Sequence, residues 1–265
     1  MPKDQALEPW SGSVGSEQAL LCRVLHRDAL MIVLDKPAGM PVHAGPRNAQ
    51  ARNAQKSGHA SIPLTSLFEA LRFGLPRRPE LAHRLDRDTS GCLVLGRNRA
   101  ALEKLGRLFQ SGDIKKTYWA VVDGSPAAEQ GVIELPLGRR DPSRGWWMKV
   151  DPQGIAAMTR WRVIGRAAAS PDHMAMTALA LEPVTGRTHQ LRVHCAAMGW
   201  PILGDAVYGT APRSPEPALH LHARAIEIPL YPRREPIRVE APIPSRMREA
   251  LAACGVQDET TADPR

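Results

Sequence analysis

The chain has 265 residues, a length that suits one catalytic domain and leaves little room for a second domain of ordinary size. Its 35 lysines and arginines outnumber its 27 aspartates and glutamates, and the resulting net charge of +8 makes nucleic acid the leading class of partner, with an ordinary basic protein as an equal alternative on charge alone. Four scattered cysteines without a C-x-x-C pair argue against a disulfide framework and a zinc ribbon, and no apolar run reaches spanning length, so we expect a cytoplasmic protein with no membrane segment.

The two ends of the chain are polar, and we expect a flexible segment over 1–20, a folded catalytic domain over 21–250 and a flexible tail over 251–265. An apolar β-branched run predicts a strand at 29–34, which Pro37 and Gly39 bring to a turn. Residues 44–59 then carry three basic residues and no acidic one. This stretch is interpreted as a basic loop insertion, either a flexible linker or a contact to RNA.

The following residues predict a helix at 61–73, a strand at 92–96, a helix at 100–110 and a strand at 116–122. Further strands are predicted in the apolar or alternating runs at 132–137, 157–164, 176–181 and 219–228. Strands and helices do not alternate regularly, which favours an α+β domain over a doubly wound parallel sheet.

The densest polar cluster is the string HRLDRDTSG at 83–91, which by itself would be a solvated turn. These nine residues resemble the signature of the RluA-type pseudouridine synthases, which modify uridines in large-subunit ribosomal RNA and transfer RNA. The resemblance continues, in the family's order, at LDKPAGMPVH (34–43), KKTYWAVVDG (115–124) and VTGRTHQLRVHCAAMGWPILGDAVYG (184–209). It covers about 28–240 and implies the family's α+β fold, a mixed and mostly antiparallel central sheet with flanking helices.

The resemblance also implies roles for individual residues. Asp86 takes the place of the catalytic aspartate, Tyr118 that of the tyrosine that packs on the target base, and Arg187 that of the arginine expected to pair with the aspartate. Arg84 takes the place of the side chain that enters the RNA when the nucleotide is extruded. The chemistry agrees, because a carboxylate that acts as a nucleophile or stabilises a cationic sugar must be ionised, and a guanidinium favours ionisation.

A helix is expected to begin at a Thr188 cap after Arg187. Its predicted inner face holds Leu191, Cys195 and Met198. His189 and His194 lack zinc-site spacing, so they are expected to be structural, and no metal or other cofactor is expected.

Several residues are predicted to contact RNA. GRRDPSRGWWMKV at 138–150 interleaves basic residues with two tryptophans, which suits base stacking beside phosphate contacts, although relatives carry basic residues at the tryptophan positions. A solvated hairpin with one packed tryptophan is an equal alternative. The predicted RNA-binding residues are Arg84, His83, Arg139, Arg140, Arg144, Trp146, Trp147 and Arg192.

The chain is thus interpreted as a monomeric RNA pseudouridine synthase that isomerises a uridine in rRNA or tRNA, with Asp86 as nucleophile. The polar residues before the folded unit are too few for the S4-type domain with which many members begin, so a short form is expected. Two alternatives stay open: a non-catalytic RNA-binding or ribosome-assembly factor on the same fold, and an RNA glycosidase that releases the base.

Overall fold

A computed structural model describes residues 16–43, 62–140, 147–169, 174–213 and 218–257. The predicted loop at 44–59 and the positions of Arg144 and Trp146 lie outside these ranges. In the described part, ten strands form one sheet, in the order β1-β2-β4-β11-β5-β10-β9-β6, with β12 beside β11 and β3 beside β4. A separate hairpin joins β7 (Leu137–Arg139) and β8 (Met148–Val150).

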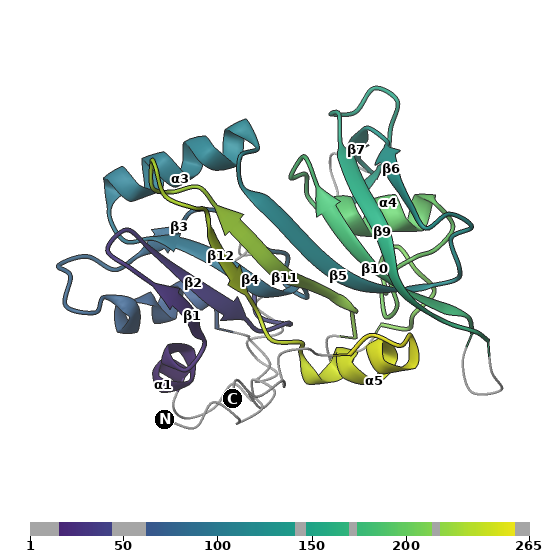
Figure 1. Cartoon of the computed structure of the whole chain (residues 1–265), viewed down its shortest axis with the longest axis horizontal. Coiled ribbons are helices and arrows are strands. Elements are labelled where there is room, and N and C mark those ends of the chain that lie inside the picture. Colours follow the sequence, from purple (N-terminus) through teal and green to yellow (C-terminus); the bar gives the residue numbers. More distant parts are fainter. Residues whose placement is uncertain (1–15, 44–61, 141–146, 170–173, 214–217, 258–265) are drawn as a thin grey trace, which may run out of the picture.

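The strands of the large sheet are β1 (Val24–Arg27), β2 (Met31–Lys36), β3 (Glu80–Leu81), β4 (Ser90–Gly96), β5 (Lys115–Asp123), β6 (Gln130–Glu134), β9 (Met158–Ala167), β10 (Met176–Pro183), β11 (Leu221–Ile228) and β12 (Ile237–Glu240). Its pairings are antiparallel except that of β4 with β11, which is parallel. Figure 1 shows β11 and β5 in the middle of the molecule, between β1, β2 and β4 on one side and β10, β9 and β6 on the other. The mixed, mostly antiparallel α+β fold is confirmed.

Helices cover both faces of the sheet. They are α1 (Ser16–Leu21), the 3-10 helix η1 (Leu64–Leu71), α3 (Arg99–Ser111), α4 (Gln190–Ala197) and α5 (Ser245–Ala253). Helix α3 packs on β4, α4 on β10, and α5 on β5 and β9. Because β2 and β4 are covered on both faces, every one of their residues is buried, which explains their unbroken apolar runs. None of the described helices combines the length and apolarity that a membrane crossing requires.

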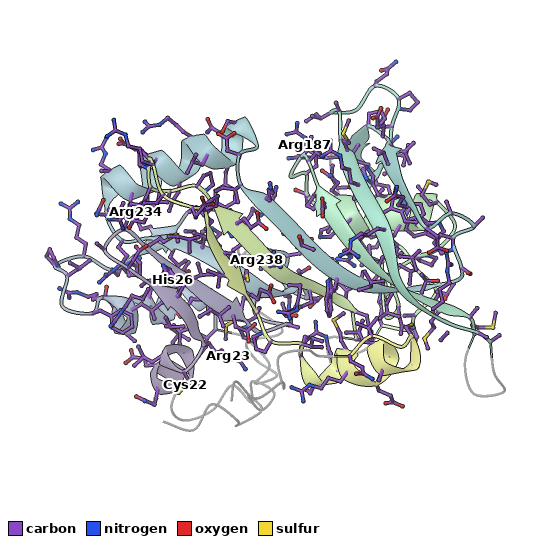
Figure 2. All side chains as sticks on the ribbon, viewed as in Figure 1. Cys22, Arg23, His26, Arg187, Arg234 and Arg238 are labelled. Atoms are coloured by element: carbon purple, nitrogen blue, oxygen red, sulfur yellow. The ribbon has the colours of Figure 1, made fainter. Side chains whose placement is uncertain are left out.

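The folded unit extends beyond the predicted 21–250 at both ends. Helix α1 begins at Ser16, and Leu20 is buried in the core. Figure 2 labels Cys22 and Arg23 just after α1, where the Arg23 guanidinium lies 3.0 Å from the Asp35 carboxylate of β2. At the other end, Cys254 lies beyond the predicted boundary and is buried with apolar side chains of α5 that pack on the sheet. The polar composition of the residues that follow placed the predicted boundary too early.

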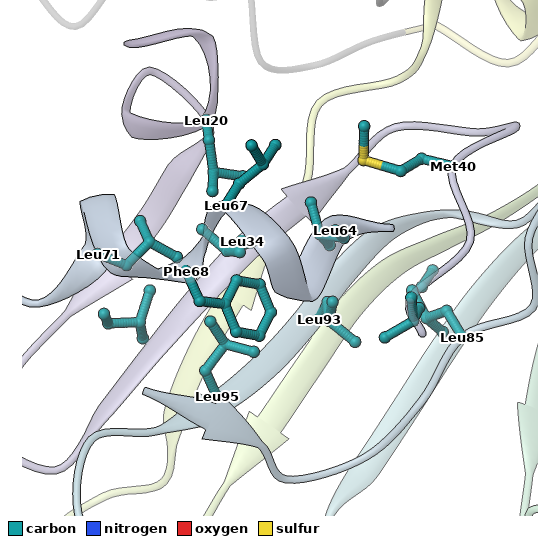
Figure 3. Close-up of a cluster of buried hydrophobic side chains, with 13 residues drawn as sticks. Leu20, Leu34, Met40, Leu64, Leu67, Phe68, Leu71, Leu85, Leu93 and Leu95 are labelled. Carbon is teal, nitrogen blue, oxygen red and sulfur yellow. The ribbon is translucent and has the colours of Figure 1, made fainter. Parts of the chain in front are cut away.

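One apolar cluster positions the motif at 83–91. It contains Leu34 of β2, Leu93 and Leu95 of β4, the buried face of η1, and Leu85 from the motif itself (Figure 3). Burial of a leucine side chain contributes about 1.5–3 kcal/mol, so Leu85 anchors the loop firmly to the sheet.

Two predicted elements differ in detail. The helix at 61–73 is the shorter η1, and the predicted strand at 132–137 is divided, since β6 ends at Glu134 and β7 begins at Leu137. Pro136 lies in the interruption and has no N–H to donate to a neighbouring strand.

Candidate active site

Asp86 lies in the loop between β3 and β4, directly after the buried Leu85. The Thr89 amide donates to the carbonyl oxygen of Asp86 at 3.2 Å and closes a tight turn that leads into β4. Gly91 follows with φ +103, and a Cβ there would lie 2.2 Å from the carbonyl oxygen of Ala223 in β11. Glycine is therefore required at position 91, where β4 meets its parallel neighbour β11. In the turn before it, the Asp86 side chain is 20% exposed.

The fully buried Lys36 at the end of β2 holds the backbone of this loop. Its ammonium donates to the carbonyl oxygens of Pro37, Arg87 and Thr89 at 2.8, 2.8 and 2.9 Å. Burial lowers the pKa of Lys36 to about 7, while the negative charges of Asp88 and Asp86 oppose that shift. The three acceptors use all three N–H groups of an ammonium, so this geometry favours the charged form.

Tyr118 of β5 lies at the junction of the two largest apolar clusters, partly buried against both. Burial raises the pKa of its hydroxyl above the ordinary value, and the negative charge of Asp86 raises it further. The hydroxyl is therefore neutral near pH 7.

Among the described residues, His189 is the basic side chain within ion-pair distance of Asp86. Its Nε2 lies 3.9 Å from Asp86 Oδ2. Its Nδ1 is 2.9 Å from the hydroxyl of Tyr208, which accepts the Met148 amide of β8 at 3.0 Å. The His189 side chain is only 7% exposed. Burial lowers the pKa of His189, and the charge of Asp86 compensates only in part, so the ring is neutral near pH 7.

Arg192 is buried rather than available to RNA, which corrects its predicted role. Its Nε and Nη2 donate to the two carboxylate oxygens of Asp205 at 2.8 and 2.7 Å. Burial alone would lower the pKa of Arg192, but the hydrogen bonds and charge of Asp205, with a smaller contribution from Asp86, raise it. Arg192 is thus charged, and its orientation is fixed by the two-point contact with Asp205.

Arg187 does not form the predicted pair with Asp86. Its side chain is exposed, and its Nε donates to the carbonyl oxygen of Ala156 at 3.2 Å. Figure 2 labels it in the half of the molecule that contains β9 and α4. The reason is the start of α4: His189, not Thr188, is the N-cap residue, and its left-handed φ of 53 directs the chain so that Arg192, on the first turn, faces inward.

The two predicted RNA contacts before Asp86 differ from each other. Arg84 is exposed. His83 instead accepts a hydrogen bond from the Val94 amide at Nε2, 3.0 Å away, and its ring packs against Phe109. Burial lowers the pKa of His83 to about 3, so this histidine is an uncharged structural residue and not a phosphate contact.

The hairpin β7–β8 presents basic and aromatic side chains beside the site. Arg139 and Arg140 are exposed, and the guanidinium groups of Arg140 and Arg213 lie 5.9 and 5.7 Å from the ring centre of Trp147. A surface cavity of about 290 Å³ is lined by residues of the hairpin and of α4, which also contact each other, and by Tyr208.

No group of side chains in the described ranges has the composition of a metal site. His194 Nε2 donates to the Leu135 carbonyl oxygen at 3.0 Å, and its Nδ1 lies 2.9 Å from Thr159 Oγ1, so both ring nitrogens have structural partners. Helix α4 ends at Ala197, before Met198. Met198 was expected on the inner face of the helix, but it is 45% exposed.

The residues that sequence reasoning missed as site residues are Lys36, His189, Asp205 and Tyr208. All four fall inside the motif segments 34–43 and 184–209, but nothing in their spacing indicates which of them contact one another.

Comparison with known proteins gives a consistent result. A model of the RNA pseudouridylate synthase family matches residues 30–197. An uncharacterised RNA pseudouridine synthase of Zymomonas mobilis is 39% identical over 84% of this chain and 94% of its own, and ribosomal large subunit pseudouridine synthase C of Vibrio cholerae is 34% identical over 86% and 68%. Among solved structures, human RNA pseudouridylate synthase domain containing 4 superposes with a TM-score of 0.70 at 25% identity, over 91% of this chain and 96% of that one.

Proposed function

This chain belongs to the RNA pseudouridylate synthase family, whose members are isomerases that act on RNA, and from that membership we propose that it converts a specific uridine to pseudouridine with Asp86 as nucleophile. The position of Asp86 supports this assignment most directly. Its carboxylate is partly exposed, lies on a loop anchored by Leu85 and Lys36, and has His189 Nε2 at 3.9 Å, while its negative charge raises the pKa values of Tyr118 and Arg192.

The reaction needs no net exchange of atoms with a cofactor. The Asp86 carboxylate attacks the ribose C1′, or stabilises the cationic sugar, as the bond from C1′ to uracil N1 breaks. The uracil turns, and its C5 forms the bond to C1′ while any ester bond from Asp86 to C1′ breaks. The hydrogen on C5 then leaves as a proton and N1 takes up a proton, so the net change is an isomerisation. The attack requires an ionised carboxylate, and we propose that the buried Arg192, rather than Arg187, supplies the positive charge that favours ionisation.

Tyr118 is proposed to pack its ring on the uracil. Because burial keeps its hydroxyl neutral, the group can donate a hydrogen bond but is a poor base for the C5 proton. Arg84 is proposed to occupy the place that the extruded nucleotide leaves.

The RNA is proposed to be a structured stem-loop of large-subunit ribosomal RNA or of transfer RNA. The net charge of +8 favours a polyanionic partner, and the Vibrio cholerae relative is named for the ribosomal large subunit. The exposed Arg139 and Arg140 of the hairpin are candidates for phosphate contacts, with Trp147 as a stacking surface between arginines.

The test uses RNA transcribed with uridine tritiated at C5, either large-subunit rRNA fragments or tRNA. The proposal predicts release of tritium to water together with pseudouridine in the digested RNA, without free uracil. Free uracil would instead indicate a glycosidase, and binding without tritium release would indicate a non-catalytic RNA-binding factor.

A further inference from the structure

We infer that His189 is a positioning residue for Asp86: its ring, fixed by Tyr208, directs an N–H at the carboxylate and keeps it oriented toward the ribose. This inference rests on the proposed function of Asp86. Two contacts carry it, the 3.9 Å separation of His189 Nε2 from Asp86 Oδ2 and the 2.9 Å separation of His189 Nδ1 from the Tyr208 hydroxyl.

The hydrogen bonds around Tyr208 indicate which ring nitrogen of His189 carries the proton. The Tyr208 hydroxyl accepts from the Met148 amide at 3.0 Å, and its single hydrogen then has His189 Nδ1 as an acceptor at 2.9 Å. The proton of a neutral His189 is then on Nε2. The opposite tautomer would direct the lone pair of Nε2 at an anionic carboxylate, which is unfavourable.

The backbone of His189 is held in an uncommon conformation that serves this placement. Its φ of 53 lies in the left-handed region, where side chains other than glycine are infrequent and carry a cost. The residue occupies the N-cap of α4 but makes no side-chain cap hydrogen bond, so helix capping does not account for its ring. Its polar side chain is used instead between Tyr208 and Asp86.

The 3.9 Å separation of His189 Nε2 from Asp86 Oδ2 is longer than a hydrogen bond, and we expect it to shorten when RNA binds. A hydrogen bond requires a separation of about 2.7–3.2 Å, and such contacts in free enzymes are often long and shorten when the substrate excludes water. The Met148 amide belongs to β8, whose hairpin carries Arg139 and Trp147. Met148, Tyr208 and His189 therefore link a predicted RNA-binding hairpin to the carboxylate in three contacts.

A comparison of His189→Gln with His189→Leu isolates the N–H. Both replacements meet the same strain at positive φ, but only glutamine has an amide N–H that can reach Asp86. We expect His189→Leu to lower the single-turnover rate by on the order of 10–100-fold, as misplacement of a reacting group does, with the Kd for RNA changed less than about threefold. His189→Gln should recover at least part of the rate, and Tyr208→Phe should lower it.

Two controls keep the test specific. His194→Gln alters a buried histidine of the same helix that contacts Thr159 and not Asp86, so it should retain the parental rate in protein that remains folded by thermal melting. Nitrogen-15 NMR of the histidine rings should show the His189 proton on Nε2 in the parent and a loss of that preference in Tyr208→Phe.

The inference is overturned if His189→Leu turns over at the parental rate while Asp86→Asn is inactive, if glutamine and leucine are equally impaired, or if the proton resides on Nδ1. An equal loss in His194→Gln would also overturn it, because the effect would then be structural. An active Asp86→Asn would instead contradict the proposed function itself, so the two failures are distinguishable.

Discussion

The buried ammonium of Lys36 donates to the carbonyl oxygen of Arg87 at 2.8 Å, immediately after Asp86 in the chain. This contact joins the end of β2 to a loop that is 51 residues away in sequence. The backbone of the loop that carries Asp86 is therefore held by an interior lysine as well as by its own turn. This contact gives a physical reason why the motif segment with Lys36 accompanies the segment with Asp86.

Replacement of Lys36 by methionine should loosen this loop. The carbonyl oxygens of Pro37, Arg87 and Thr89 would lose their donor, and the turn that the Thr89 amide closes would open more often. We expect faster hydrogen exchange at the Thr89 amide and a single-turnover rate lower by about tenfold or more. Lys115→Met, at an exposed lysine, is the matched control. Equal hydrogen-exchange protection of the Thr89 amide in both variants would show that Lys36 does not hold the loop.

Replacement of Arg192 by lysine should be far more damaging than the same change at Arg187. A lysine cannot reproduce the two-point contact with Asp205 and would leave that buried carboxylate poorly paired, at a cost of about 3–5 kcal/mol if the pair is broken. Arg187→Lys, on an exposed side chain, should keep activity within about threefold. Urea denaturation and single-turnover rates measure both effects. The reverse order would restore Arg187 as the partner of Asp86.

His83 should make the protein less stable in acid. Burial lowers its pKa in the folded protein to about 3, whereas the unfolded chain takes up the proton near 6.5. Its contribution to stability is thus complete above pH 6.5 and is lost as the pH falls toward 3, by about 1.4 kcal/mol per pH unit.

His83→Gln removes this titration while retaining a side-chain acceptor for the Val94 amide. The slope of unfolding free energy against pH, from urea denaturation between pH 4 and 6, should become shallower by about one proton. RNA affinity should be unchanged. An unchanged slope with weakened RNA binding would return His83 to the RNA surface.

Much of the fold follows from local sequence patterns. The predicted strand segments and α3 appear close to their expected positions, whereas β1, β3, β8 and β12 were not predicted. Apolar runs mark β2 and β4, and Asn98, whose Oδ1 accepts from the Ala101 amide at 2.9 Å, starts α3 where the helical pattern begins. The order of the strands in the sheet is not written in such patterns. The parallel contact of β4 with β11 joins segments about half the chain apart, and only tertiary packing defines it.

Sequence motifs predict individual site residues but not which of them contact one another. The motifs indicated Asp86 and Tyr118, but the choice between Arg187 and Arg192 depends on the left-handed turn at His189, which periodicity does not reveal. Both histidines are buried, His189 at the N-cap of α4 and His194 in the last turn of the same helix. The sequence pattern does not distinguish them. Their neighbours in space, Asp86 for one and Thr159 for the other, separate their roles.

Arg84 should matter most when the target uridine is stacked. The backbone around Leu85 is irregular and Leu85 is buried, so Arg84 and Asp86, one residue to either side, are exposed or partly exposed. Extrusion of a stacked nucleotide costs a few kcal/mol, which a guanidinium stacked in the vacated place offsets in part. Arg84→Ala should therefore lose most of its activity on a stem-loop and much less on a short RNA whose uridine is unstacked. Equal single-turnover losses on the two substrates would remove this role from Arg84.

The most direct test of the central claim is the single-turnover rate of Asp86→Asn on an RNA that the parent protein modifies, measured as tritium release from C5. Asparagine keeps the size of the side chain and removes its charge and nucleophilicity, so the rate should fall by at least about 1,000-fold. The Kd for RNA should stay within about threefold of the parent, because phosphate contacts dominate binding. A variant that releases tritium at a rate near that of the parent would show that Asp86 is not the nucleophile.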